Sequence, residues 1–169
     1  AIFGAAPEAL EANRLTLEDL EQALLAGKIA SYAQGFAMLE AASNEYKSAL
    51  PMPEIAKVWR EGCIIRSAML NDMADALLNK PNTNLMFSPH FAKLMKDTHF
   101  ALRKVAAEAA LSGNPAPALS ASLSYFDMMR TGRSTANMIQ AQRDFFGAHS
   151  FERIGETGSH HGPWNGVGE

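Results

Sequence analysis

The stretch TLEDLEQALLAGKIASYAQGFAMLEAAS, residues 16–43, establishes the class of fold. Its large apolar residues recur at helical spacing and no proline interrupts them: Leu20, Leu24, Ile29, Tyr32, Phe36 and Leu39. Thr16, followed three residues later by Asp19, predicts a capped helix start, because the hydroxyl and the carboxylate can each accept a backbone N–H of the other residue. The pattern therefore predicts a helix of about 27 residues, or about 40 Å.

The middle of this predicted helix is rich in small residues, which include Gly27, Ala30, Ser31, Ala33 and Gly35. Small side chains let the backbone of another helix approach closely, so we expect this helix to be central and buried on several sides. Gly35 costs about 1 kcal/mol relative to alanine in a helix interior, which indicates a packing role.

Shorter amphipathic patterns follow, separated by proline and glycine. They predict helices at 53–60, 67–78, 90–111 and 118–130, and one more that begins after Thr135 as its cap. No stretch alternates with period two. The sequence therefore predicts an all-α, multi-helix bundle with a long central helix and an irregular C-terminal tail. Its expected divisions are a lead-in (1–14), a helical domain (15–153) and a Gly-rich tail (154–169).

Composition and charge limit the possible functions. A chain of 169 residues with a net charge of −3 and a pI near 6.0 does not suit a general nucleic-acid or membrane-surface binder. The one cysteine, Cys63, excludes an intrachain disulfide and fits a reducing cytoplasm. No apolar run has the length of a membrane span, and no export signal is present, so we expect a soluble, cytoplasmic protein. Neither G-x-G-x-x-G nor a P-loop occurs, so the chain carries no dinucleotide-binding fold of its own.

The most suggestive site lies in TANMIQAQRDFFGAHSFE, residues 135–152. Arg143 lies among apolar residues and is expected to be buried, and His149 follows the position where the helix is expected to break, at Gly147. On a continuous helix the two would point about 120° apart, but a chain reversal would let both face one anionic ligand. The alternative is a surface pair between Arg143 and Asp144 with a capping histidine, and the local pattern alone favours that alternative.

Two other groups of residues have candidate chemistry. His160 and His161 could bind a metal, but no further ligands stand nearby at suitable spacing, so a mobile polar tail is the better interpretation. Asp72 and Asp75 could form an acid/base pair, although solvated carboxylates on a helix face are more common. We expect no metal site.

Four single residues are interpreted as structural. Cys63 has no base nearby in the sequence, and its apolar neighbours predict a buried thiol. His90 and His99 lie nine residues apart on the polar edge of one predicted helix. Arg66 directly follows an apolar run, which favours a buried salt bridge.

Several segments, in order, resemble the C-terminal helical domain of the decarboxylating 6-phosphogluconate dehydrogenases. They are KIASYAQGF (28–36), VWREGCIIRS (58–67), PAPALSASLSYFD (115–127), ANMIQAQRDFFGAHSFER (136–153) and the H-x-x-W of residues 161–164. The resemblance covers roughly residues 15 to 166. The chain departs from the family at Ser134-Thr135, Glu61 and Ser48, which affects packing and helix entry more than the site.

The resemblance implies an oxidoreductase of the pentose phosphate pathway and of gluconate utilization. In this family an N-terminal Rossmann domain binds NADP, or NAD in some members, and the enzyme is a homodimer. Arg143 and His149 are then expected to reach the partner's substrate, with Arg143 on the sugar phosphate and His149 on polar groups. The catalytic lysine and glutamate lie upstream in the family, so no catalytic or cofactor-binding residue is assigned here.

The expected function is therefore to supply a dimer interface and, in trans, substrate residues for the oxidative decarboxylation of 6-phosphogluconate to ribulose 5-phosphate. The start at Ala1 suits a piece of a longer polypeptide, which alone would be inactive. The alternative is a non-catalytic helical binding or dimerisation module that lacks the coenzyme domain. A related β-hydroxyacid dehydrogenase is a weaker third interpretation.

Overall fold

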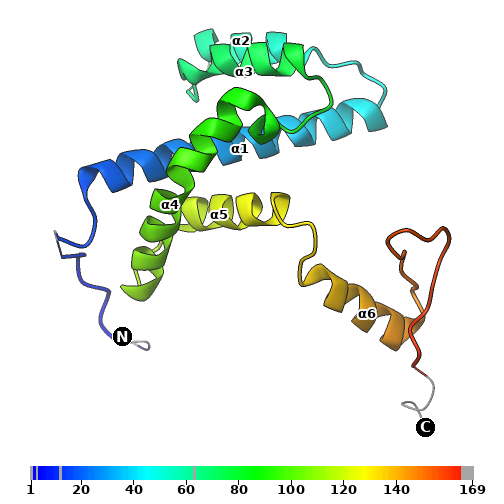
Figure 1. Ribbon diagram of the computed structural model, residues 1–169. Helices are drawn as coiled ribbons and strands as arrows, with labels where there is room; N and C mark the ends of the chain where they lie inside the picture. Colours follow the sequence, from blue (N-terminus) through cyan, green and yellow to red (C-terminus); the bar gives the residue numbers. More distant parts are fainter. Residues whose placement is uncertain (1, 3, 12, 63, 165–169) are drawn as a thin grey trace. The chain divides into compact units, whose positions relative to one another are not determined.

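A computed structural model describes residues 2, 4–11, 13–62 and 64–164 (Figure 1). Six α-helices and one short 3₁₀ helix make up its regular structure: α1 (Leu17–Glu45), α2 (Met52–Gly62), α3 (Met69–Asn79), η1 (Leu85–Phe87), α4 (Pro89–Leu111), α5 (Pro117–Met129) and α6 (Ala136–Gly147). Within these residues the chain forms no strand beyond one isolated antiparallel bridge. The predicted all-α class is confirmed. The chain divides into two compact units, Ala1–Phe126 and Asp127–Glu169.

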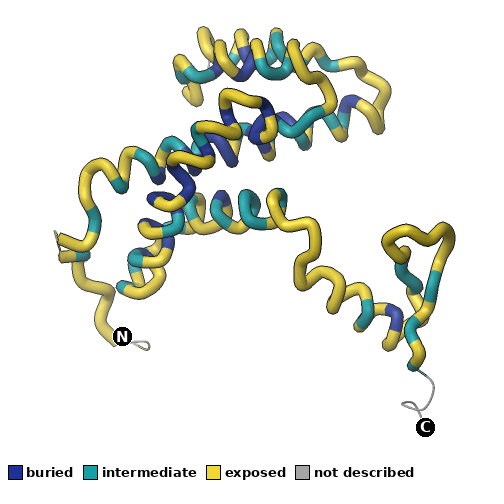
Figure 2. Tube along the Cα trace, viewed as in Figure 1, coloured by how far each residue is buried: buried dark blue, intermediate teal, exposed yellow. Residues whose placement is uncertain are grey.

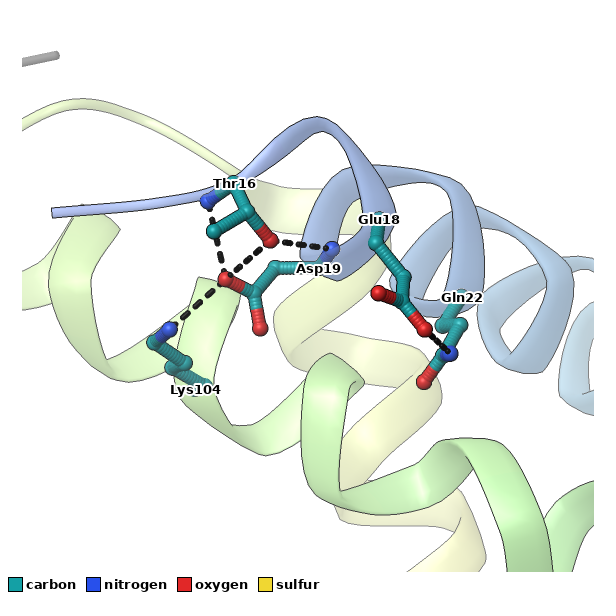
Figure 3. A network of polar contacts seen from close by, with 5 residues as sticks. All are labelled: Thr16, Glu18, Asp19, Gln22 and Lys104. Atoms are coloured by element: carbon teal, nitrogen blue, oxygen red, sulfur yellow. Dashed lines mark hydrogen bonds and ion pairs between the residues drawn. The ribbon is translucent and has the colours of Figure 1, made fainter. Parts of the chain in front are cut away.

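The start of α1 is held by the predicted reciprocal cap (Figure 3). The Asp19 N–H donates to Thr16 Oγ1 at 3.0 Å, and the Thr16 N–H donates to Asp19 Oδ2 at 2.8 Å. Lys104 Nζ on α4 lies 2.6 Å from the same carboxylate oxygen. The hydrogen bond from Lys104, followed by those from Thr16, lowers the pKa of Asp19 from 3.8 to about 2. The cap therefore also ties α1 to α4.

The core of the first unit lies where α1 packs against α4, and α2 lies beside α3 (Figure 1). Figure 2 shows the buried residues gathered along these helices. The amphipathic helix predicted at 90–111 is confirmed as α4, and six residues at helical spacing along it are buried: Phe91, Met95, Thr98, Leu102, Val105 and Ala109. Leu94 is half-buried.

Small residues of α1 face this core, as predicted, while some of its leucines do not. Ala23, Ala26, Ala30 and Ala33 are completely buried, whereas Leu20 and Leu24, expected on the apolar face, are 45% and 58% exposed. The expectation that α1 is buried on several sides is therefore wrong along part of its length. The reason is that close packing of two helices selects small side chains at the contact and leaves large ones at its edge.

The two glycines of α1 have different surroundings. A Cβ at Gly27 would lie 2.7 Å from Leu119 Cδ2 of α5, so α5 packs directly on this backbone. Ser122 on α5 also donates to the Gly27 carbonyl at 3.3 Å. A Cβ at Gly35 would meet nothing within 4 Å. The packing role predicted for Gly35 thus belongs to Gly27 in this structure.

The second unit contains α6 and the chain that follows it. Thr135 stands at the N-cap position of α6, as predicted, but its φ and ψ of −59° and −11° are helical and its side chain makes no capping hydrogen bond. Ser134 Oγ instead accepts from the Ala136 N–H at 3.2 Å. The helix ends at Gly147, and the residue that follows it, Ala148, adopts the left-handed conformation with φ 49° and ψ 40°. The predicted chain reversal is present one residue later than Gly147.

None of the described helices has the length and apolar character that crossing a membrane requires.

Candidate functional site

Arg143 and His149 both lie at the surface of the second unit. Arg143 is in the last turns of α6, and His149 directly follows the left-handed residue Ala148. The expectation of a buried Arg143 is wrong, because its apolar neighbours Phe145 and Phe146 are themselves exposed. Both side chains are instead accessible to a ligand or to another molecule, which is what a binding role requires.

Gly147 lies directly under the ring of His149. A Cβ at this glycine would approach both Cδ2 and Nε2 of His149 to 3.0 Å, closer than neighbouring atoms normally allow. No left-handed φ is needed at Gly147, so the effect of glycine here is to leave space for the ring in its present orientation. Its missing side chain lets the imidazole fold back over the end of α6.

Asp144 is turned inward and receives four hydrogen bonds. Oδ1 accepts from the Ser150 N–H at 2.8 Å and lies 2.5 Å from His161 Nδ1. Oδ2 accepts from the Gly162 N–H at 2.8 Å and from Trp164 Nε1 at 2.6 Å. These four bonds use the lone pairs of the carboxylate, and its side chain is fully buried. The alternative of a surface pair between Arg143 and Asp144 is therefore wrong.

The ionised form of Asp144 is strongly favoured. Burial by itself raises the pKa of a carboxyl group, but the bonds from Gly162, Trp164, His161 and Ser150 outweigh that effect. The pKa of Asp144 consequently lies well below its ordinary value.

The described part of the predicted tail, residues 154–164, is held against α6, so the prediction of a mobile polar tail is wrong for these residues. Phe151 and His160 form an antiparallel bridge with two hydrogen bonds of 2.9 Å. Trp164 packs edge to face on Phe145, with ring centroids 5.7 Å apart. A Cβ at Gly162 would come within 2.2 Å of the Trp164 ring, so this ring also needs a glycine beneath it.

The two adjacent histidines have separate partners. His161 bonds to Asp144, while His160 Nε2 lies 3.5 Å from Glu156 Oε2. In the part of the chain that the structure describes, no three His, Cys, Asp or Glu side chains come together as a metal site would require.

The other residues that the sequence singled out include Asp72, Asp75, His90, His99 and Cys63. Asp72 and Asp75 are exposed, and His90 is an exposed neighbour of Asp72, with 3.9 Å between His90 Nε2 and Asp72 Oδ2. His99 is buried against Phe100 and Phe126, so its predicted position on a polar edge is wrong. Cys63, predicted to be a buried thiol, lies outside the described residues.

Arg66 is exposed, so the predicted buried salt bridge is wrong. It lines a pocket of about 540 Å³ in the first unit, together with Lys28, Ser31 and Ser122. Tyr32 also lines it and donates to the Ile65 carbonyl. The volume lies in the range of small-molecule sites, and the two cations suit an anionic ligand. Sequence reasoning missed this pocket, because it is formed by three segments far apart in the chain.

A second pocket, of about 750 Å³, lies within the second unit beside α6. Arg133, Asn137 and Gln140 line one side, and Ser150 and Phe151 line another. Neither Arg143 nor His149 belongs to it, so these two residues are presented on the outer surface of the unit.

Comparisons with known proteins agree on one family. A family model described as 6-phosphogluconate dehydrogenase, C-terminal domain, matches residues 3–164. The chain is 46% identical over 149 residues to the Escherichia coli (strain K12) 6-phosphogluconate dehydrogenase, decarboxylating, which covers 88% of this chain and 32% of that protein. It is 44% identical over 150 residues to the NAD(+)-dependent, decarboxylating enzyme of Bacillus subtilis (strain 168), with the same coverage.

A solved structure is similar over almost the whole chain. It is the Plasmodium falciparum 6-phosphogluconate dehydrogenase, described in its apo form and in complexes with its cofactor NADP+ and its substrate 6-phosphogluconate. The TM-score is 0.86 at 36% identity, over 96% of this chain and 36% of that chain. The chain thus spans about a third of the length of the relatives it matches.

Proposed function

Because the chain belongs to the 6-phosphogluconate dehydrogenase family, whose C-terminal domain it represents, we propose that it serves the oxidative decarboxylation of 6-phosphogluconate to ribulose 5-phosphate. Its residues 15–153 form the helical domain that binds substrate and forms a dimer, preceded by the lead-in 1–14 and followed by the tail 154–169. Hydride passes to NADP+ or NAD+, which a Rossmann domain outside this chain binds. This domain contributes binding groups, and the groups that move protons lie outside it.

The observation that carries the proposal is the joint exposure of Arg143 and His149 at the end of α6. A guanidinium offers a planar fork of donors that matches a phosphate, and an imidazole offers one further donor or acceptor. Both stand beside a helix end that Asp144 fixes, so the two groups are held in place before a ligand arrives. Such prior placement reduces the entropy lost on binding.

The same two residues act on the substrate of a partner subunit. Outward presentation at the surface of the second unit supports a role in trans, as does the absence of both residues from the pocket beside α6. In this arrangement Arg143 binds the sugar phosphate and His149 binds polar groups of the sugar acid. The enzyme is then a homodimer whose substrate site is complete only in the assembled form. We also propose that the protein is cytoplasmic, because a chain with a single cysteine cannot form an intrachain disulfide and fits a reducing compartment.

Replacing Arg143 tests the proposal in the polypeptide that joins this chain to its coenzyme-binding domain. Arg143→Ala is expected to raise KM for 6-phosphogluconate at least about tenfold, because a charge-assisted contact with the phosphate is lost. KM for the coenzyme is expected to stay within about twofold, because the coenzyme binds elsewhere.

Arg14→Ala is the matched control, since it removes an exposed arginine whose partners are Glu11 and Glu108. Steady-state kinetics with both substrates varied separates the two KM values. An unchanged KM for 6-phosphogluconate in Arg143→Ala would contradict the role of Arg143.

A further inference from the structure

We propose that Asp144 is a positioning residue, which holds His149 in its binding orientation by fixing the residues on both sides of it. The inference rests on the proposed substrate role of His149. If it is right, substrate affinity also depends on Asp144 and on its partners in the tail, His161 and Trp164.

Asp144 controls the backbone before and after His149. Its main-chain carbonyl accepts the Ala148 N–H at 2.8 Å, and its carboxylate Oδ1 accepts the Ser150 N–H at 2.8 Å. His149 is the residue between these two anchors. A single residue of α6 thus determines the path of the chain at the imidazole.

Both anchored residues have an unfavourable backbone conformation. Ala148 has φ 49° and Ser150 has φ 60°, in the left-handed region that residues with a Cβ rarely occupy. Such conformations persist only where the surrounding structure holds them. The carboxylate of Asp144 holds one of the two residues, Ser150, through its N–H, and Ser150 Oγ also lies 2.6 Å from Ser159 Oγ. Ala148 keeps its bond to the main-chain carbonyl of Asp144 when the carboxylate is removed. Loss of the carboxylate is therefore expected to relax the chain at Ser150 and to let the ring of His149 leave Gly147.

The tail keeps the carboxylate in place. His161, Gly162 and Trp164 all bond to Asp144, and the Trp164 ring is further held by Phe145. A buried carboxylate without such donors would be strongly unfavourable. The motif H-x-x-W at residues 161–164 therefore acts on His149 through Asp144, although it lies more than ten residues further along the chain.

Asp144→Asn tests this in the full polypeptide. The amide keeps the size of the side chain, but its NH₂ group cannot accept hydrogen bonds, so one pair of donors loses its acceptor. KM for 6-phosphogluconate is expected to rise about tenfold with kcat changed less than about threefold, because a binding group is misplaced. Glu152→Gln is the matched control, a carboxylate-to-amide change at an exposed position of the same loop. Its KM is expected to equal that of the parent.

A spectroscopic measurement reports on the bonds to Asp144 without depending on activity. The indole N–H of Trp164 donates to a carboxylate, so its ¹H resonance is expected far downfield, and Trp164→Phe identifies it by its disappearance. In Asp144→Asn this resonance is expected to move upfield by a clearly measurable amount. An unmoved resonance would show that the bond is not made in solution and would overturn the proposal.

A double-mutant cycle separates positioning from a general structural role. If Asp144 acts through His149, Asp144→Asn adds less than about a twofold rise in KM when His149 is already alanine. Trp164→Phe, which removes one donor and keeps a ring on Phe145, is expected to give a smaller rise than Asp144→Asn. It serves as the second variant if the asparagine protein does not fold.

The outcomes distinguish the inference from the proposed function. A tenfold rise in KM caused by Asp144→Asn in both the parent and the His149→Ala background would overturn the role through His149. A normal KM in Asp144→Asn, with a raised KM in His149→Ala, would overturn the inference and leave the proposed function standing. A normal KM in His149→Ala itself would overturn both.

Discussion

The contact between Gly147 and His149 is the point where a single missing Cβ affects the orientation of the imidazole, which is proposed to bind substrate. The imidazole lies over the glycine, with no room for a Cβ between them. The ring is an end of a side chain and can rotate away, whereas the helix backbone cannot. A substitution at Gly147 therefore changes the direction of His149 before it changes the fold.

Gly147→Ala is expected to raise KM for 6-phosphogluconate severalfold without lowering the free energy of unfolding. The added methyl group displaces the ring, while alanine has a higher helix propensity than glycine and no left-handed φ at Gly147 opposes it. Kinetics on the full polypeptide and thermal unfolding give the two quantities. Gly132→Ala is the control, because a Cβ there would meet nothing within 4 Å. A Gly147→Ala protein with normal KM would show that the orientation of His149 over Gly147 has no part in binding.

At the scale of the element, the start of α1 depends on one carboxylate. Asp19 accepts from the Thr16 N–H, from the Thr16 hydroxyl at 2.8 Å and from Lys104 (Figure 3). The first two bonds satisfy groups at the helix end, and the third crosses to α4. A single side chain thereby caps one helix and connects it to another, and its protonation weakens both functions.

The stability of the chain is expected to fall as the pH drops from about 3.8 towards about 2, in part because of Asp19. Its pKa is about 2 in the folded chain and returns to the ordinary 3.8 on unfolding. In this range the unfolded state binds more protons, so acid favours unfolding, and above pH 3.8 the stabilisation is fully present.

Thermal unfolding followed by circular dichroism between about pH 2 and pH 6 tests this. The difference in Tm between the parent and Asp19→Asn is expected to be largest at the upper end and to shrink towards pH 2. Asp144, whose pKa is also lowered, is present in both proteins and cancels in the difference. Asp75→Asn on α3, a change of the same kind at an exposed carboxylate, is the control for the substitution itself. A difference in Tm that stays constant with pH would contradict the role assigned to Asp19.

At the scale of the whole molecule, large apolar side chains remain exposed in both units. Met38 is 67% and Ile64 is 100% exposed in the first unit, while Met138 and Phe146 are 66% and 79% exposed in the second. Large apolar side chains that stay exposed in one chain are commonly covered by a partner. Together with Gly35, whose open side meets no neighbouring residue, they support the proposed homodimer.

Sedimentation velocity on the chain at micromolar concentration is expected to give the mass of a dimer. Burial of the exposed apolar side chains against a second copy supplies the driving force, and stable interfaces of this kind are extensive. Met138→Asp, which places a charge among the exposed apolar residues of α6, is expected to shift the distribution towards monomer. Glu152→Gln provides a control of similar exposure. A compact monomer in the parent would contradict the proposal.

Local sequence patterns correctly predicted the class of fold, the start of α1 and the amphipathic helix that forms α4. Each depends on residues three or four apart, a range in which helix geometry brings side chains together without help from the rest of the chain. The sequence also placed the chain reversal near Gly147 and singled out Arg143 and His149, but only the resemblance to a family favoured a binding role for these two residues. Local spacing alone favoured a surface pair.

Which faces of the helices are covered depends on how the helices pack against one another. Periodicity marked Leu20 and Leu24 as apolar, but the packing of α1 against α4 buried alanines and left these leucines exposed. Likewise, Asp144 bonds to residues 17 to 20 positions further along the chain, which no local pattern connects to it. The physical reason is the same in both cases: burial and the partners of a carboxylate depend on segments that the fold brings together, and a sequence pattern describes only neighbours.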